Sequence, residues 1–411
     1  MKKFVAKTFK YLLFTVLGLL ITVNLFIVLS GRFYLYKGLA TTYLVGKTGP
    51  SIYDLDIFPS STLKSRENQS FIPYHKNVNT HYISDKQREL LESLETKAFL
   101  VFKGNTLMYE EYWDKHDATT VSNSFSVAKT VVAMLIGIAI EDGYIKNLDE
   151  PVSNYLPEFK DKGRAGITIR HLLAMASGLD WSESSKDPLS DNAESYYGSD
   201  LKRLVMNQKR TTEPGKTFIY QSGNSQLLGM IIEKATGKDL TVYAEEKIWK
   251  KIGAEHDSYW SLDRENGDEK AFCCLYAVAR DYGRIGQLFL NKGRYNEEQV
   301  IPEWYYEEMV ATSKLTTEDG IPNTRYGLHI WKYNHTDGQV NYCRGVNGQY
   351  IIAQPDQDLL IVRLGEERMP TLTLEDHKLN PKKVTLDKIG HTFELFEYLR
   401  IGKEVNLNTK E

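Results

Sequence analysis

The sequence predicts an α+β protein in which helices flank an antiparallel sheet, a mostly helical region is inserted, and one N-terminal helix spans a membrane. The run from 100 to 113 has two strand-like halves around Gly104-Asn105, which indicates a hairpin. The run from 348 to 364 has two more around Pro355-Asp356-Gln357-Asp358. Between these strands, helical periodicity dominates and recurs at 169–175, 225–235 and 276–290.

A continuous apolar helix is predicted over 130–140, just after the first hairpin. Its sequence, TVVAMLIGIAI, is apolar on every side and is followed by Glu141-Asp142-Gly143. A helix that is apolar all round is buried, and a glycine just beyond its end favours the left-handed cap conformation. We therefore expect this helix in the core.

The N-terminus has the features of a membrane anchor. The 21 residues from Tyr11 to Gly31 carry no charge and are mostly Leu, Ile, Val or Phe, which is enough helix to cross a bilayer. Four lysines precede the run, so the positive-inside tendency places the rest of the chain on the periplasmic (extracytoplasmic) side of the inner, or cytoplasmic, membrane. A cleavable signal peptide ending near Val28-Leu29-Ser30 is the alternative, although the run exceeds the usual ~7–15 residues.

Four segments follow from these patterns. Residues 1–32 form the cytoplasmic lysines and the transmembrane anchor, and the turn-rich stretch 33–85 forms a connector or N-terminal extension. Residues 86–402 form the main domain, with a helical region at about 148–265. Residues 403–411 form a polar tail.

Composition narrows the classes of partner. The chain has 51 Lys plus Arg against 54 Asp plus Glu, so it offers no polycationic surface and we expect no nucleic-acid partner. The three cysteines imply no disulfide framework, because adjacent residues such as Cys273 and Cys274 pair only with strain. Neither CxxC nor HExxH occurs, so we expect no metal.

A Ser-x-x-Lys motif stands at the start of the apolar helix. Ser126 and Lys129 are one helical turn apart, so the lysine amine can take the serine proton. The same spacing at Ser61–Lys64 and Ser199–Lys202 shows that chance supplies it, but only Ser126 begins a core helix. A plain serine N-cap is the alternative reading.

Five sequence blocks stand out, in the order SFSVAKTVVAMLIGIAIEDGYIKNLDEPVSNYLPEF, ITIRHLLAMASGLDW, EPGKTFIYQSGNSQLLGMIIEKATGK, LYAVARDYGRIGQLFLNKGR and RGVNGQYIIAQPDQDLLIVRLG. Together they resemble the class C β-lactamase and penicillin-binding-protein-like serine hydrolases. The similarity covers roughly residues 100 to 398 and is nearest the branch of 6-aminohexanoate-oligomer hydrolases and esterases. It implies a β-lactamase/transpeptidase-like fold, with the active site in a cleft between a sheet domain and a helical domain.

Carried over by position, the resemblance implies that Ser126 is the nucleophile, Lys129 its proton partner and Tyr220 the relay to the leaving group. Tyr220-Gln221-Ser222 has serine where the family usually has asparagine. Two other registers remain open, namely Ser222-Gly223-Asn224 and the literal class A motif Ser190-Asp191-Asn192.

The third family motif maps to Val346-Asn347-Gly348-Gln349, without the usual cation. The resemblance implies that the N–H groups of Gln349 and Ser126 form the oxyanion hole, with Gly348, Ser222 and Asn347 beside the substrate. On a strand, Arg344 shares a face with Val346 and is the candidate replacement for the missing cation.

These features predict a membrane-anchored serine hydrolase that forms an acyl-enzyme with a small-molecule ester or amide and uses no cofactor. A β-lactamase or D,D-peptidase is the alternative within the same enzyme class. A non-catalytic binding or sensor domain of the same fold is the alternative from another class, because the second and third motifs are altered.

Overall fold

The computed structural model describes residues 2–65, 72–76, 78–79, 83–184 and 186–407. Its main sheet has six antiparallel strands in the order β11-β12-β13-β14-β2-β3. The first and last pieces of the main domain thus meet, because β14 pairs with β2. The strands are β2 (Thr96–Lys103), β3 (Thr106–Tyr112), β11 (Trp331–His335), β12 (Gly338–Gly345), β13 (Gln349–Gln354) and β14 (Leu359–Gly365).

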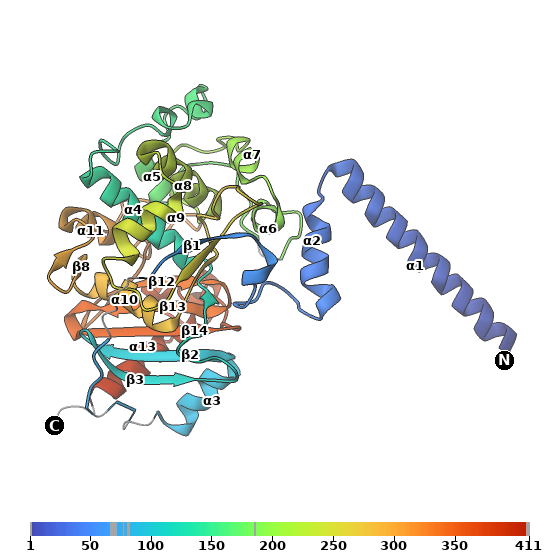
Figure 1. Cartoon of the computed structure of the whole chain (residues 1–411). Helices are drawn as coiled ribbons and strands as arrows, with labels where there is room; N and C mark the ends of the chain where they lie inside the picture. The colour runs from blue at the N-terminus through green and yellow to red at the C-terminus, as the bar shows by residue number, and fades with distance from the viewer. Residues whose placement is uncertain (1, 66–71, 77, 80–82, 185, 408–411) are drawn as a thin grey trace.

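Both predicted hairpins are confirmed. β2 and β3 turn at Gly104, whose φ of 56° lies in the left-handed region, and β13 and β14 flank the turn at 355–357. Helices α10 (Ala279–Leu290) and α13 (Phe393–Leu407) cover opposite faces of this sheet (Figure 1), and α3 (Asp85–Ser93) packs near β2. The core therefore lies on both sides of the sheet.

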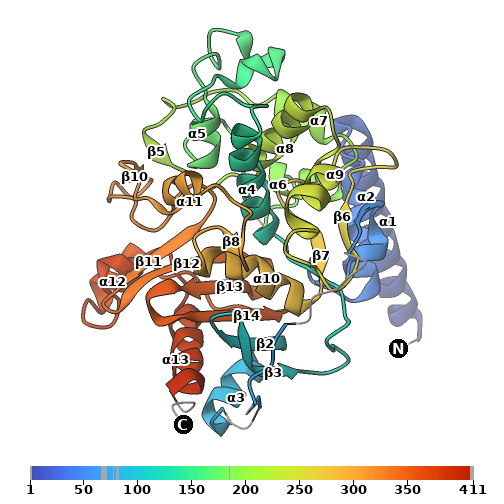
Figure 2. The same ribbon diagram turned by 60° about the vertical axis from the view of Figure 1, so that its left-hand side comes forward.

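The predicted core helix is α4 (Val127–Glu141), and its residues from Val127 to Ala139 are buried. It lies between the main sheet and the helical region (Figure 2), with contacts to α8 on one side and to β12 and β13 on the other. The other helices of this region and its surroundings are α5 (Ile169–Leu173), α6 (Asp191–Tyr197), α7 (Leu201–Met206), α8 (Ser222–Thr236), α9 (Leu240–Ala244) and α11 (Glu303–Val310).

A second, four-stranded sheet has the order β1-β6-β7-β4 and was not predicted. The connector contributes β1, which pairs with β6 and so attaches the N-terminal extension to the body. One predicted helix is shorter than expected, because Tyr276 lies in a strand and α10 begins only at Ala279. Tyr276 pairs with Tyr259 and Asn123, so tertiary pairing overrides the local helical pattern. These strands are β1 (Ser60–Leu63), β4 (Ser122–Asn123), β6 (Ser258–Ser261) and β7 (Leu275–Ala277).

Smaller elements complete the described chain. They are β5 (Thr217–Phe218), β8 (Arg294–Tyr295), β9 (Glu298–Gln299), β10 (Thr316–Thr317), α12 (Leu374–Leu379), a π-helical turn (Glu245–Trp249) and short 3-10 turns at Tyr43–Val45, Leu55–Ile57, Val152–Asn154, Pro157–Lys160, Val346–Gly348, Pro355–Gln357 and Leu386–Lys388.

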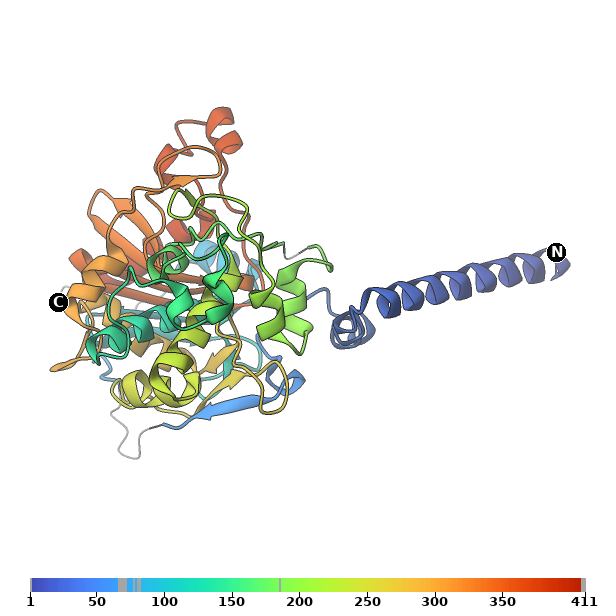
Figure 3. The same ribbon diagram turned by 90° about the horizontal axis from the view of Figure 1, so that it is seen from above.

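The N-terminal helix α1 (Lys2–Ser30) projects away from the body, whereas α2 (Tyr34–Thr41) lies against it beside α6 (Figures 1 and 3). The segment 7–30 of α1 is long and apolar enough to cross a membrane, and almost all of it is exposed. The same properties are found in signal sequences near an N-terminus. Among the residues that the structure describes, one helix thus has the length and hydropathy of a membrane anchor or a signal sequence.

Candidate active site

Ser126 lies at the start of α4, with Lys129 one turn further on. The Lys129 Nζ atom is 2.9 Å from the Ser126 Oγ atom and donates a hydrogen bond to it. The Ser126 side chain makes no capping hydrogen bond, so the N-cap interpretation does not describe its contact. The N–H groups of Val127, Ala128 and Lys129 bond to carbonyls of residues 124–126, which fixes this first turn tightly around the hydroxyl.

The environment of Lys129 favours the neutral amine that a base needs. Its side chain is 1% exposed, and its Nζ atom also donates to the Phe272 carbonyl at 2.7 Å. Burial lowers the pKa of Lys129 to about 8, while the negative charge of Glu183 acts in the opposite direction. A tenth or so of such a lysine is neutral at pH 7, enough to act as a base.

Tyr220 reaches the same serine from the segment before α8. The nearby Ser126 hydroxyl acts to lower the pKa of the Tyr220 phenol, and the Lys129 Nζ atom lies 5.3 Å from the centre of the Tyr220 ring. The ring stacks on Trp331 with the centroids 5.7 Å apart. Burial raises the pKa of Tyr220 above its usual value, and the charge of Glu183 raises it further, although the Ser126 hydroxyl opposes this shift. The phenol therefore keeps its proton at neutral pH and can donate it.

The two other registers of the second motif are divided by the structure. Ser190 caps α6 by accepting a bond from the Ala193 N–H, whereas Asn192 of the same register lines the cavity that contains Ser126. Asn224 is buried, and its Oδ1 atom accepts a bond from the Ser177 hydroxyl at 2.7 Å. Ser222 borders the same cavity as Ser126, and its hydroxyl donates to the Glu183 carboxylate at 2.7 Å.

The third motif departs from the expected geometry. Residues Val346–Gly348 form a tight turn between β12 and β13 rather than a strand, and Asn347 has a φ of 60°. The Asn347 amide donates to the Pro50 carbonyl at 2.9 Å and to the Glu366 carboxylate. Pro50 lines the same cavity as Ser126, so the place of Asn347 beside the substrate stays a prediction.

Gly348 and Gln349 also lie outside the wall of the cavity that contains Ser126. A side chain at Gly348 would meet the Arg363 guanidinium at 2.3 Å, and the buried Gln349 amide donates to the carbonyls of Val346 and Gly365. Val346, in contrast, lines that cavity. At Gly345 a Cβ atom would lie 2.4 Å from the Ser124 carbonyl, so the end of β12 passes close to the nucleophile turn.

Two arginines lie near this end of the site. The Arg344 guanidinium lies 3.8 Å over the Trp331 ring and donates to the Gly390 carbonyl at 3.1 Å. The charges of Arg344 and Arg368 both act on Tyr220. Burial and the neighbouring Arg344 lower the pKa of Arg368. The third motif lacks its usual cation, but the positive charges of Arg344 and Arg368 lie close to Tyr220. Arg344 is already bound to the Trp331 ring and the Gly390 carbonyl.

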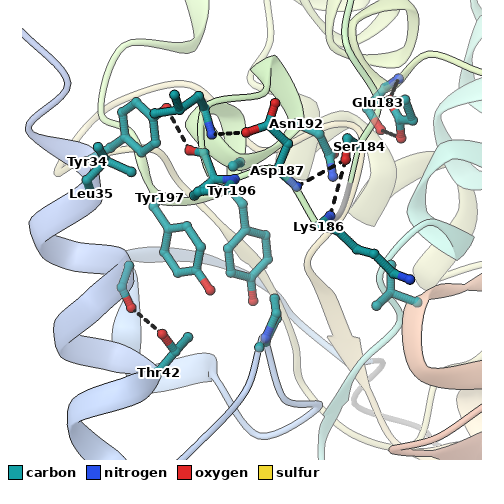
Figure 4. A pocket seen from close by; sticks show the side chains of 18 of the residues that line it. Tyr34, Leu35, Thr42, Glu183, Ser184, Lys186, Asp187, Asn192, Tyr196 and Tyr197 are labelled. Carbon is teal, nitrogen blue, oxygen red and sulfur yellow. Dashed lines mark hydrogen bonds between the residues drawn. The ribbon is translucent and has the colours of Figure 1, made fainter. Parts of the chain in front are cut away.

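A cavity of about 490 Å³ adjoins Ser126 and Lys129. Residues of the helical region line one side of it, and residues of α1 and α2 line another. In Figure 4, Tyr34 lies on one side and Glu183 on the other, with Tyr196 and Tyr197 between them. The Ser222 side chain also borders this space. The volume falls within the range of ligand-binding pockets, roughly 300–1,000 Å³.

The family model described as Beta-lactamase matches residues 86–371. The chain belongs to the beta-lactamase family. It is 24% identical over 333 residues to the 6-aminohexanoate-dimer hydrolase of Paenarthrobacter ureafaciens, covering 75% of this chain and 82% of that protein. It is 32% identical over 283 residues to the N-acetylmuramyl-L-alanine amidase of Bacillus subtilis (strain 168), covering 56% of this chain and 64% of the relative.

Solved structures agree on the fold of this beta-lactamase family member. The structure described as "Putative 6-aminohexanoate-dimer hydrolase from Bacillus anthracis" superposes with a TM-score of 0.72 at 23% identity, covering 87% of this chain and 93% of that one. The predicted β-lactamase/transpeptidase-like α+β fold is therefore confirmed. Membership places the chain among serine hydrolases.

Glu183 is a residue of the site that the sequence analysis missed. Its carboxylate accepts bonds from the Ser222 N–H and hydroxyl, both at 2.7 Å, and from the Trp181 indole at 2.8 Å. Burial raises the pKa of Glu183, whereas the positive charge of Lys129 lowers it. Ser222 is thus held by a carboxylate from a loop 39 residues earlier in the chain. No local pattern around Glu183 indicates this pairing.

The expectation for the cysteines also needs correction, because Cys273 and Cys274 form a disulfide with each other. The bond joins neighbours in a buried turn, so it closes a local ring and crosslinks no distant segments. Phe272, immediately before it, supplies the carbonyl that holds the Lys129 ammonium. The disulfide therefore belongs to the structure that surrounds Lys129.

Proposed function

We propose that the protein hydrolyses a small-molecule ester or amide through an acyl-enzyme on Ser126. The observation that supports this most is the convergence of two proton-carrying groups, Lys129 and Tyr220, on one serine hydroxyl. A buried lysine with a pKa of about 8 and a phenol with a raised pKa form a base and an acid at neutral pH.

In the proposed first half-reaction, the neutral amine of Lys129 takes the Oγ proton as the oxygen of Ser126 attacks the substrate carbonyl carbon. The resulting oxyanion accepts one bond from the Ser126 N–H and a second from the backbone N–H of Gln349 in the third motif. Tyr220 donates its proton to the leaving oxygen or nitrogen, and the Lys129 ammonium returns a proton to the phenolate. Water then attacks the ester of Ser126 by the reverse proton movements, which frees the acid product and regenerates the serine.

The substrate class rests on the relatives and on the third motif. Two relatives are described as a dimer hydrolase and an amidase, and both descriptions refer to acyl transfer to water. A β-lactam carboxylate needs a cation or strong donor beside the third motif, and a charge-assisted contact contributes roughly 1.5–3 kcal/mol. Val346 offers none, and Arg344 is engaged with Trp331 and Gly390. Simple esters and amides therefore fit better than cephalosporins.

The test is a comparison of kcat/KM for p-nitrophenyl acetate and for nitrocefin with the purified full-length protein. The ester should be hydrolysed far faster, and Ser126→Ala should reduce its turnover to background, a loss on the order of 10³-fold or more. Ser199→Ala is the matched control, because Ser199 and Lys202 repeat the same spacing on an exposed turn. Efficient nitrocefin turnover that disappears in Arg344→Ala would instead support a β-lactamase.

We further propose that α1 stays as an anchor, with the catalytic domain on the extracytoplasmic side of the cytoplasmic membrane. Support comes from the length and hydropathy of the segment 7–30 and from the lysines ahead of it. The buried disulfide is typical of an oxidising compartment. Protease added to intact spheroplasts should digest the catalytic domain; protection until lysis would reverse the topology, and a soluble form beginning near Gly31 would show cleavage.

A further inference from the structure

The cavity beside the catalytic serine extends to the end of the candidate membrane helix. One end of its wall is formed by Ser126 and Lys129, and the other by Val23, Phe26 and Ile27 in the last turns of α1. Ile27 is 1% exposed, although its neighbours along α1 are exposed. A segment composed to lie in lipid therefore forms part of the wall of the substrate cavity.

The helix α2 forms the adjoining wall and is fixed to the catalytic body. The Tyr34 hydroxyl donates to the Pro188 carbonyl at 2.9 Å, and the Arg32 guanidinium donates to the Leu189 carbonyl at 2.9 Å. Gly38 lies against the Tyr197 ring, where a Cβ atom would already be in contact at 3.5 Å. These bonds set the position of the end of α1 relative to Ser126, so the apolar wall is a built feature of the site (Figure 4).

The surface just beyond α1 is also apolar. Phe33, Tyr43, Leu44 and Val45 are exposed, and Leu44 is 79% exposed. Aromatic and apolar side chains that follow a spanning helix are typical of the membrane–water interface, and a cluster of them on a surface marks an interaction site. The cavity end that α1 lines consequently lies at the level where lipid chains begin.

We propose that this cavity binds the hydrocarbon chain of a membrane-resident ester or amide, whose carbonyl group reaches Ser126 from the outer leaflet. The inference rests on the proposed hydrolase function and on retention of α1. A polar substrate gains no binding energy from a wall of Val23, Phe26, Ile27 and Leu39, whereas a chain gains roughly fourfold in affinity for each methylene that it buries. The specificity of the enzyme is therefore for chain length.

The experiment uses the full-length protein in phosphatidylcholine vesicles, with p-nitrophenyl acetate and p-nitrophenyl decanoate as probes. The decanoate should have a kcat/KM at least ten times that of the acetate. Hydrolysis of the acetate with no gain for the decanoate would overturn the inference and leave the hydrolase function standing. Failure to hydrolyse either ester, or hydrolysis that persists in Ser126→Ala, would overturn the hydrolase function itself.

Variants at Leu39 test whether the hydrocarbon chain of the substrate lies in this cavity. Leu39 lines the cavity from α2 and is partly exposed, so Leu39→Asp puts a charge in the wall, and Leu39→Trp fills space without a charge. Both should lower the decanoate-to-acetate ratio at least tenfold. Leu379→Asp is the matched control, because Leu379 is an exposed leucine on α12, and its ratio should equal that of the wild type. An unchanged decanoate-to-acetate ratio in both Leu39 variants would place the hydrocarbon chain of the substrate outside this cavity.

Discussion

The two ends of the cavity beside Ser126 differ in the side chains that line them. At the catalytic end, each polar group has a defined partner, such as the Lys129 ammonium between Ser126 and the Phe272 carbonyl. At the other end, α1 contributes the apolar side chains Val23, Phe26 and Ile27, and α2 contributes Leu35 and Leu39 beside the Tyr34 hydroxyl. In the proposed function, reactivity therefore comes from the family domain, and in the further proposal, specificity comes from the N-terminal extension.

The largest effect on the catalytic end should come from the acid that serves the leaving group. Tyr220→Phe removes the proposed proton donor and leaves the ring stacked on Trp331. Turnover of p-nitroacetanilide, an amide whose leaving nitrogen must be protonated, should fall by roughly 10²–10⁴-fold, measured as kcat on the purified protein.

Ser190→Ala is the control for this prediction, because Ser190 caps α6 and belongs to the rival motif. It should cost about 1 kcal/mol of stability with little change in kcat. The opposite ranking of the two variants would return the acid role to Ser190 and break the assignment of the catalytic end.

A smaller effect should appear in the pH profile. Lys129 acts as a base only when neutral, so kcat/KM should rise as the pH increases through about 8 and then level off. The charge of Glu183 raises the pKa of Lys129, so Glu183→Gln should move the rising limb to lower pH. The measurement is kcat/KM for a short ester from pH 5 to 10, with exposed Glu213 changed to Gln as the control. A rising limb that stays in place, or moves upward, would separate Glu183 from the catalytic end.

Local patterns predicted those parts of the fold that neighbours in the sequence determine. The hairpin at Gly104, the core helix α4 and the pair β13–β14 each have their signal within about 17 residues, and each was predicted correctly. Tyr276 was not, because pairing with β4 and β6 decides its conformation. The four-stranded sheet joins segments from 60 to 277 and left no signal in any single window.

The residues of the candidate site also fall into those that local sequence predicted and those that it did not. Ser126 and Lys129 share one helical turn and were identifiable from spacing, and Tyr220 was identifiable because its block resembles the family. The strand expected at the third motif was wrong, since Asn347 takes a left-handed turn there. Glu183 was missed, since its only link to the site is a pair of bonds to Ser222. The contribution of α1 and α2 was also missed, because a membrane segment has no pattern that indicates contact with an active site.

The proposed hydrolase must form a covalent acyl-type adduct on Ser126. The direct test is to incubate the full-length protein with an alkyl fluorophosphonate, digest it and locate the added mass by tandem mass spectrometry. The label should be found on Ser126 alone and should be absent from Ser126→Ala. An unlabelled protein, or a label on Ser61 or Ser199, would contradict the account and favour a non-catalytic domain or a different nucleophile.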